Sequence, residues 1–170
     1  MGNNRRARRW LVTGVVGVLG ASGLVGVAAA AGSPASVTRG ELVPFAAGAG
    51  GSTSGRAFMV RTTHGSTVVQ LHARGLVPGR QYASHVHAAP CGVGAADGHY
   101  KHDPAGAPTP PNEIWPGGGP FVASRAGTAS ERAVADFVAG ANAVSVVVHD
   151  LSLPSTANKI ACADLGGAVR

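Results

Sequence analysis

Short runs of alternating apolar and polar residues recur along the chain from residue 56 onward. In residues 66–76, positions 69, 71 and 73 are apolar and the positions between them are polar. Successive side chains of a strand point to opposite faces, so this pattern predicts a strand with one buried face. Comparable runs predict further strands at residues 56–62, 81–87, 112–115, 120–124, 132–138, 143–150 and 159–165, of which 112–115 leads into 120–124.

Turn-forming residues separate these runs. The sequence THGS (63–66) fits a hairpin turn, and VPGR (77–80) fits a turn before the next strand. Residues 88–111 are rich in Gly and Pro and have no periodicity, which predicts one long loop. No segment after residue 31 has a helical period, so we expect an all-β sandwich or barrel. Long loops on such a scaffold often carry function, which directs attention to residues 88–111.

The first 31 residues differ in composition from the rest. Four arginines and no acidic residue precede an apolar run of about twenty residues, and an Ala-rich stretch follows. This order predicts a secretory signal peptide at residues 1–31, with an uncleaved membrane anchor as the alternative. The Gly- and Ser-rich composition of residues 32–55 predicts a flexible segment, which leaves residues 56–170 as the folded domain. We therefore expect an exported protein, either secreted or held in the cell envelope.

Charge argues against a nucleic-acid partner. The whole chain has a formal net charge of +6, but without residues 1–31 it keeps ten basic and eight acidic side chains. No basic stripe interleaved with aromatic residues is present in the sequence. The two cysteines, Cys91 and Cys162, form an even pair in a chain that we expect to be exported. Such a pair is most simply a disulfide bond.

The histidines are the most unusual feature of the predicted loop and its flanking strand. His85 and His87 are two residues apart on a predicted strand, so both side chains point to one face and can chelate one ion. His99 and His102 follow in the loop, and His149 ends an apolar strand. Imidazole ligands without a free thiolate suit copper in either of its oxidation states. The two remaining histidines, at positions 64 and 72, are expected to be ordinary surface residues.

Four segments, taken in order, resemble the copper/zinc superoxide dismutases, a family of Greek-key β-barrel enzymes. They are GLVPGRQYASHVHAAPC (75–91), GHYKHDP (98–104), VVVHD (146–150) and KIACADL (159–165). The resemblance implies a Greek-key barrel of about eight antiparallel strands. It also implies that His85 and His87 are the paired copper ligands, that His149 is the last copper ligand, and that Cys91 and Cys162 form the disulfide bond within the subunit.

The family's Gly-His-aromatic motif contains a histidine that bridges copper and zinc. In GHYKHDP, His99 follows a glycine and precedes an aromatic residue, whereas His102 lies nearer to the Asp-Pro pair. We take His99 as the ligand and His102 as the alternative. The family's zinc ligands have no counterpart, because no histidine lies between His102 and His149. A zinc site is therefore doubtful, and the chain resembles the copper-only branch of the family.

Two further positions follow from this resemblance. In the copper-only branch an acidic residue can orient the bridging histidine by a hydrogen bond, and Glu113 is the candidate here. A solvated loop carboxylate is the alternative reading of Glu113. The arginine that guides the anion in the family is replaced by Lys159, which keeps the charge but loses the planar guanidinium.

The resemblance implies an exported copper enzyme, a superoxide dismutase that converts superoxide to dioxygen and hydrogen peroxide. His99 would couple proton uptake to electron transfer, and Lys159 would attract the superoxide anion, the expected partner. The short segment between His149 and Cys162 and the missing zinc ligands support a second hypothesis, a non-enzymatic copper-binding protein on the same scaffold. A membrane is expected as a partner only through an uncleaved N-terminus, and the sequence does not predict an oligomeric state.

Overall fold

The computed structural model describes residues 35–45 and 51–168. The predicted signal peptide or anchor lies outside these residues. The described part is all-β, as predicted, with one short 3-10 turn, η1, at Gly94–Ala96. The strands are β1 (Ser36–Pro44), β2 (Ser54–Arg61), β3 (Thr67–Arg74), β4 (Gln81–His87), β5 (Phe121–Val122), β6 (Thr128–Ala135), β7 (Ser145–Asp150), β8 (Lys159–Asp164) and β9 (Gly167–Ala168).

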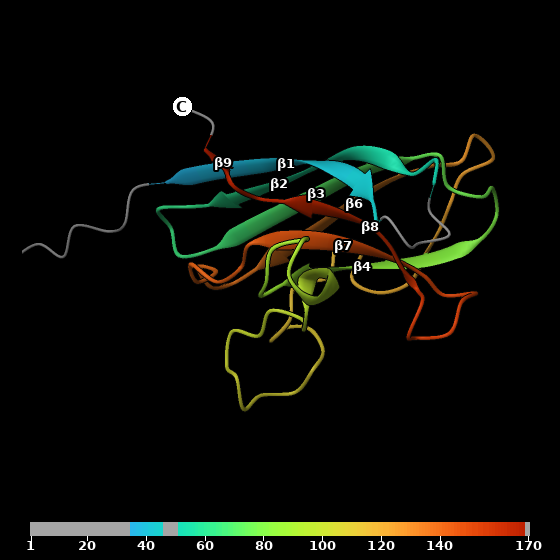
Figure 1. Ribbon diagram of the computed structural model, residues 1–170. Coiled ribbons are helices and arrows are strands. Elements are labelled where there is room, and N and C mark those ends of the chain that lie inside the picture. The colour runs from blue at the N-terminus through green and yellow to red at the C-terminus, as the bar shows by residue number, and fades with distance from the viewer. Residues whose placement is uncertain (1–34, 46–50, 169–170) are drawn as a thin grey trace, which may run out of the picture. The chain divides into compact units, whose positions relative to one another are not determined.

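The strands follow the order β5-β4-β7-β8-β1-β2-β3-β6, and all their pairings are antiparallel. β1 pairs with β2 along most of its length and reaches β8 through its last two residues, which joins the two halves of the sheet. In Figure 1, β1, β2, β3 and β6 form one layer and β4 and β7 the other. Consecutive strands β3 and β4 lie in different layers, and β6 returns to pair with β3. Such crossed connections are of the Greek-key kind.

The core lies between the two layers and consists mainly of small and β-branched side chains. Its largest fully buried members include Tyr82, Leu42, Met59, Leu71 and Ile114. On β3 the buried residues are those at alternate positions, as the sequence pattern predicts. Burial of apolar surface stabilises a fold by about 20–33 cal/mol per Å² removed from water. This interior is therefore the main source of stability of the folded protein.

The prediction of a flexible segment at residues 32–55 was wrong for residues 36–44, which form β1. The folded domain therefore begins before residue 56. Close packing requires a glycine at position 40 of this strand. A Cβ atom at this position would lie 1.9 Å from the carbonyl oxygen of Asp164, so only glycine lets β1 approach β8 this closely.

Two other expectations need correction. Residues 112–115 form no strand: the carbonyl of Ile114 accepts one backbone hydrogen bond, from Val86 of β4, and the chain enters a turn at residues 116–117. β6 begins at Thr128, four residues before the predicted strand at 132–138. Its first residues alternate between exposed and half-buried side chains, and this weak contrast hides the strand in the sequence.

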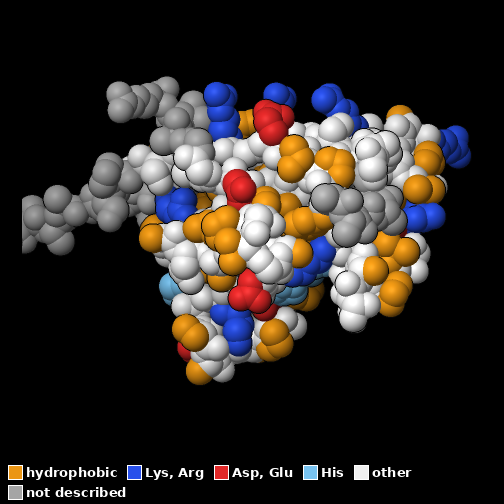
Figure 2. All heavy atoms as spheres, viewed as in Figure 1, with side chains coloured by type: hydrophobic (Ala, Val, Ile, Leu, Met, Phe, Trp, Pro, Cys, Tyr) orange, Lys and Arg blue, Asp and Glu red, His pale blue; other side chains and the backbone are white. Residues whose placement is uncertain are grey.

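The outer face of the first layer carries arginines that are far apart in the sequence. Exposed arginines from four strands share this face, namely Arg39, Arg56, Arg74 and Arg132. Figure 2 shows Lys and Arg side chains along the upper margin of the view, over the layer that contains β1.

A loop covers the opposite layer. The long loop between β4 and β5 lies against β4 and β7 (Figure 1), so every residue of β7 is buried.

No helix among the described residues is long and apolar enough to cross a membrane.

Candidate metal centre

His85 and His87 lie on the face of β4 that turns away from the core. Val86, between them, is fully buried in the core, so the two histidines point together toward the long loop. His87 has no exposed surface, and His85 is 9% exposed. The spacing of the two residues in the sequence thus places two imidazoles under the loop.

His149 comes to the same place from β7. It pairs with Ala83 of β4, two residues from His85, and a register irregularity follows Val148. Asp150 holds the end of this strand. Its carboxylate accepts a 2.8 Å hydrogen bond from Arg80 and a 2.7 Å bond from the Ser152 hydroxyl.

The long loop supplies the fourth histidine. It returns to the end of β4 at Tyr100, whose backbone N–H donates to the carbonyl of Val86. Ala88 donates in turn to Gly98, and His87 and His99 form an isolated antiparallel bridge. This backbone pairing places the His99 side chain beside the histidines of β4.

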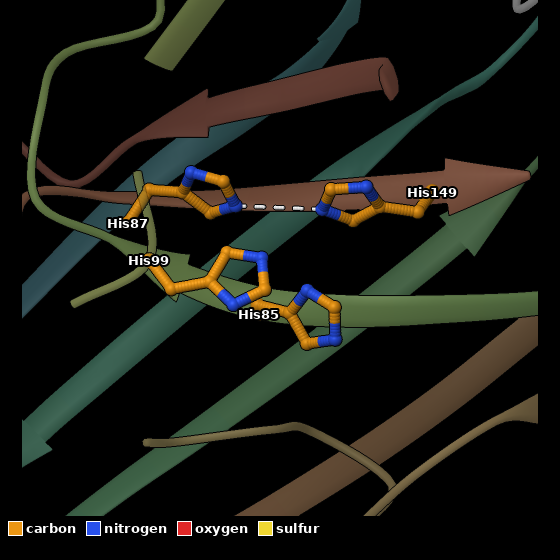
Figure 3. A group of neighbouring side chains, drawn as sticks. All are labelled: His85, His87, His99 and His149. Carbon is orange, nitrogen blue, oxygen red and sulfur yellow. Dashed lines mark hydrogen bonds between the residues drawn. The ribbon is translucent and has the colours of Figure 1, made fainter. Parts of the chain in front are cut away.

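The four histidines converge on one point. One nitrogen of each ring lies within 4.8 Å of a nitrogen of each of the other three. Figure 3 shows His87 and His149 facing each other, with His99 and His85 beside them. The Nε2 atoms of His87 and His149 are 3.4 Å apart. Two imidazoles that bind one ion at about 2 Å with a tetrahedral angle have nitrogens about 3.3 Å apart, so this spacing fits a shared ion.

Hydrogen bonds fix the tautomers of three of the rings. The Nδ1 atom of His87 lies 3.1 Å from the carbonyl oxygen of Ala96, and that of His149 lies 3.2 Å from the side-chain oxygen of Asn158. The Nδ1 atom of His99 lies 2.8 Å from Oε2 of Glu113. Because these partners are amide and carboxylate oxygens, which accept, each Nδ1 carries the proton and each Nε2 presents a lone pair.

His85 differs from the other three histidines in that its Nδ1 atom, not Nε2, is the candidate metal ligand. Its Nδ1 atom is buried and has no hydrogen-bond partner. A buried polar atom without a partner is costly, and a bound cation would satisfy it. Nδ1 of His85 and three Nε2 lone pairs therefore make a donor set of four nitrogens that fits a transition metal.

Burial keeps three of these imidazoles neutral. It lowers the pKa of His85 from 6.5 to about 2, and the charges of the neighbouring histidines act in the same direction. Burial is also the largest cause that lowers the pKa of His87 to about 3 and of His149 to about 4. Metal binding requires neutral imidazole, so these three histidines can bind an ion at neutral pH without releasing protons.

A small cavity opens onto the cluster. It has a volume of about 270 Å³ and is lined by His85, His99, His149, Leu151, Ser155, Asn158 and Lys159. His87 is not part of its lining, so three of the four imidazoles face the opening. The cavity can admit a small molecule or anion to the nitrogen cluster.

Lys159 stands at the rim of this cavity, but its ammonium group is already engaged. Nζ donates to the carbonyl oxygens of Ala95, at 2.9 Å, and of Asp97, at 2.6 Å. Burial lowers the pKa of Lys159, and the charge of Asp97 acts in the opposite direction. Ala95, Ala96 and Asp97 all have positive φ, so their carbonyls turn inward toward Lys159 and His87.

The structure separates the two histidines of GHYKHDP. His99 lies in the cluster, whereas His102 is exposed and stacks on Phe137 with a centroid distance of 4.0 Å. Glu113 is only 3% exposed, so it is not a solvated loop carboxylate. His64 is exposed, and the half-buried His72 contacts Ser130 of the neighbouring strand β6, so both histidines lie outside the cluster, as expected.

The predicted disulfide bond between Cys91 and Cys162 is present. It joins the start of the long loop to β8, next to Val147 and Ala96. The backbone N–H of Cys91 also donates to the carboxylate of Asp164 at 2.7 Å. The disulfide bond thus ties the loop segment that contains Ala96, whose carbonyl oxygen lies next to Nδ1 of His87, to the sheet.

Sequence reasoning missed three groups that contact the histidines. They are Asn158, the carbonyl of Ala96, and Trp115, whose Nε1 donates to Glu113 at 2.7 Å. Asn158 lies in a polar loop with no motif, and a backbone carbonyl leaves no residue signature. Only Trp115 had a usable signal, as an aromatic residue two positions from the candidate carboxylate.

No protein-family model and no curated protein matches this chain.

Proposed function

We propose that the protein is an exported, copper-dependent superoxide dismutase. The observation that carries this proposal is the cluster of four imidazoles, each with one nitrogen directed at a common point beside an open cavity. Imidazole suits copper, and a nitrogen-only set without thiolate or carboxylate ligands tolerates both of its oxidation states. The disulfide bond is compatible with an oxidising, exported location.

The arrangement favours copper alone over a copper and zinc pair. Nδ1 of His99, the atom that would reach a second metal, is hydrogen-bonded to Glu113. The other group of metal-ligand residues in the described part consists of Asp164 and the two disulfide-bonded cysteines, whose sulfurs are not free thiolates. Zinc therefore has no place in the proposal.

A copper ion held by the four histidines would supply one-electron chemistry in both directions, which converts superoxide to dioxygen and hydrogen peroxide. The residues around it bind, orient and move protons. Glu113 holds the Nδ1 proton of His99, so His99 can take up a further proton only at Nε2. The resulting imidazolium would be stabilised by the buried carboxylate at 2.8 Å.

The cavity controls which molecules reach the cluster. Its volume of about 270 Å³ admits a diatomic anion and water. Lys159 on its rim supplies a positive charge that favours an anionic substrate. The surrounding loop keeps bulk solvent from His87, which preserves the neutral state of the ligands.

One observation supports a second candidate, copper binding without turnover. Both hydrogen bonds of the Lys159 ammonium go to backbone carbonyls, which compensate part of its charge and restrict its movement toward an incoming anion. A protein that stores or delivers copper needs the four imidazoles but no guide for superoxide. It would bind the metal tightly and remove superoxide no faster than free copper does.

The deciding experiment measures superoxide removal per bound copper ion. The full-length protein is loaded with one equivalent of copper, and superoxide decay is followed directly by stopped-flow absorbance. A rate per copper above that of free copper, lost in the double variant His85→Ala/His87→Ala, supports the enzyme. Tight copper binding with a rate no higher than that of free copper supports the binding protein and overturns the enzyme proposal.

A further inference from the structure

Trp115 packs on one member of the histidine cluster, His85, and is linked to a second, His99, through Glu113, although it offers no metal ligand. It and Glu113 flank Ile114, whose side chain is buried in the core. The carbonyl of Ile114 accepts a hydrogen bond from Val86, which lies between the two histidines of β4. The segment is therefore anchored directly beneath the cluster, and both neighbours of Ile114 project toward it.

One oxygen atom of Glu113 joins Trp115 to His99. Oε2 accepts from the indole Nε1 at 2.7 Å and from Nδ1 of His99 at 2.8 Å. Two donors on one buried carboxylate oxygen fix its position more firmly than one donor does. The oxygen also shares its capacity as an acceptor between these two donors. The indole N–H therefore weakens the hydrogen bond that Glu113 accepts from His99.

The indole ring also packs on His85. The two ring centroids are 4.6 Å apart, and the planes are inclined by 49°. His87, His99 and His149 are oriented by a hydrogen bond at Nδ1, but Nδ1 of His85 has no partner. Packing must therefore hold the His85 ring, and Trp115 supplies a wall on one side of it.

We propose that Trp115 is a positioning residue of the metal centre, which sets the acceptor strength of Glu113 and the orientation of His85. This inference deepens the proposed function, and its copper readouts rest on that function. Trp115 is only partly buried and borders a second, shallow cavity of about 330 Å³ that also touches Glu113. Trp115 is therefore not an enclosed core residue, and its packing on His85 and its hydrogen bond to Glu113 account for its position.

Two substitutions separate the two contacts. Trp115→Phe keeps a ring against His85 but removes the N–H group that contacts Glu113. The carboxylate then accepts a stronger hydrogen bond from Nδ1 of His99. This makes Nε2 of His99 a stronger electron-pair donor to copper and favours the higher oxidation state of the metal. We expect the ratio of Cu(I) to Cu(II) affinity to fall about tenfold, which corresponds to a reduction potential lower by about 59 mV for one electron.

Trp115→Leu removes the wall as well. We expect weaker binding of both copper states, about tenfold, and a broadened electron paramagnetic resonance spectrum because the His85 ring is no longer held in one orientation. Phe58→Leu is the matched control, since Phe58 is a half-buried aromatic residue of β2 that contacts His72. Potentials and spectra of both Trp115 variants that match this control would overturn the proposal.

A readout without metal keeps the inference separate from the proposed function. In the metal-free protein, the Nδ1 proton of His99 should exchange with water faster in Trp115→Leu than in the wild type, as followed by NMR. The indole N–H resonance of Trp115 should shift in Glu113→Gln. If the wild type binds no copper, the proposed function fails while these two measurements still test the inference. Unchanged exchange and an unchanged indole resonance would refute it.

Discussion

The Nε2 atoms of His87 and His149 face each other at 3.4 Å, and both rings carry their proton on the opposite nitrogen. Two lone pairs at this distance repel each other unless a cation lies between them. The acceptors that impose this arrangement, the Ala96 carbonyl and the Asn158 side chain, come from two different loops. The fold thus holds an electrostatic conflict in place that a bound metal ion would resolve.

Removal of His87 should therefore abolish tight metal binding. We expect His87→Ala to lower copper affinity by at least about a hundredfold, measured by competition with a chromogenic chelator. The wild type should gain about 4 kcal/mol of stability at a free copper concentration a thousand times the Kd, which the variant should not. His72→Ala, on the other layer, is the control and should bind copper like the wild type. Equal affinity in His87→Ala would show that the metal binds elsewhere.

Acid should destabilise the metal-free protein. The folded-state pKa values of His85, His87 and His149 are about 2, 3 and 4, all below the ordinary 6.5. Below pH 6.5 these histidines become protonated in the unfolded chain but stay neutral in the folded protein. The contribution of the histidines to the free energy of unfolding is therefore fully present above that pH and falls as the pH drops toward 4. Each histidine contributes at most about 1.4 kcal/mol per pH unit in this window.

Chemical denaturation of the metal-free protein between pH 7 and 4.5 measures this slope. His149→Gln should make the dependence of the unfolding free energy on pH shallower, by the equivalent of up to one bound proton. His64→Gln, at an exposed position, should leave this dependence unchanged. A slope that His149→Gln does not alter would mean that His149 takes up its proton as readily in the folded protein as in the unfolded chain.

The sequence could predict most of the strands and the members of the histidine cluster because both leave a local signature. The alternation in β3 and the two-residue spacing of His85 and His87 follow directly from strand geometry. β1 was missed because the Gly- and Ser-rich composition of residues 32–55 predicts a flexible segment, and composition does not reveal that Gly40 packs against Asp164. Asn158 and the Ala96 carbonyl could not be predicted, since they reach the cluster only through the way two irregular loops fold.

The choice between His99 and His102 can be tested directly. His99→Ala should lose tight copper binding, because its ring is one of the four in the cluster. His102→Ala should keep copper affinity within about twofold and lose up to about 1.5 kcal/mol of stability, since it removes only a stacking contact with Phe137. The reverse result in isothermal titration calorimetry would assign the ligand to His102.

The disulfide bond should support both stability and metal binding. Cys91 and Cys162 are 71 residues apart, and loop closure of this length corresponds to about 4 kcal/mol. Cys91→Ser/Cys162→Ser should lower the free energy of unfolding by about that amount. It should also weaken copper binding several-fold, because the segment that holds the acceptor of His87 is no longer tied to β8. Equal copper affinity in the folded variant would show that the acceptor segment keeps its place without the bond.

Lys159 distinguishes the two proposed functions, because its charge matters only to an incoming anion. Lys159→Gln keeps a donor for the carbonyls of Ala95 and Asp97, so copper affinity should be retained. If the protein turns over superoxide, loss of the charge at the cavity rim should lower the rate about three- to tenfold and flatten its dependence on salt. Lys101→Gln is the matched control, since that ammonium also donates to a carbonyl, of Gly106, but lies outside the cavity lining. A rate unchanged in Lys159→Gln at every ionic strength would exclude steering by this residue.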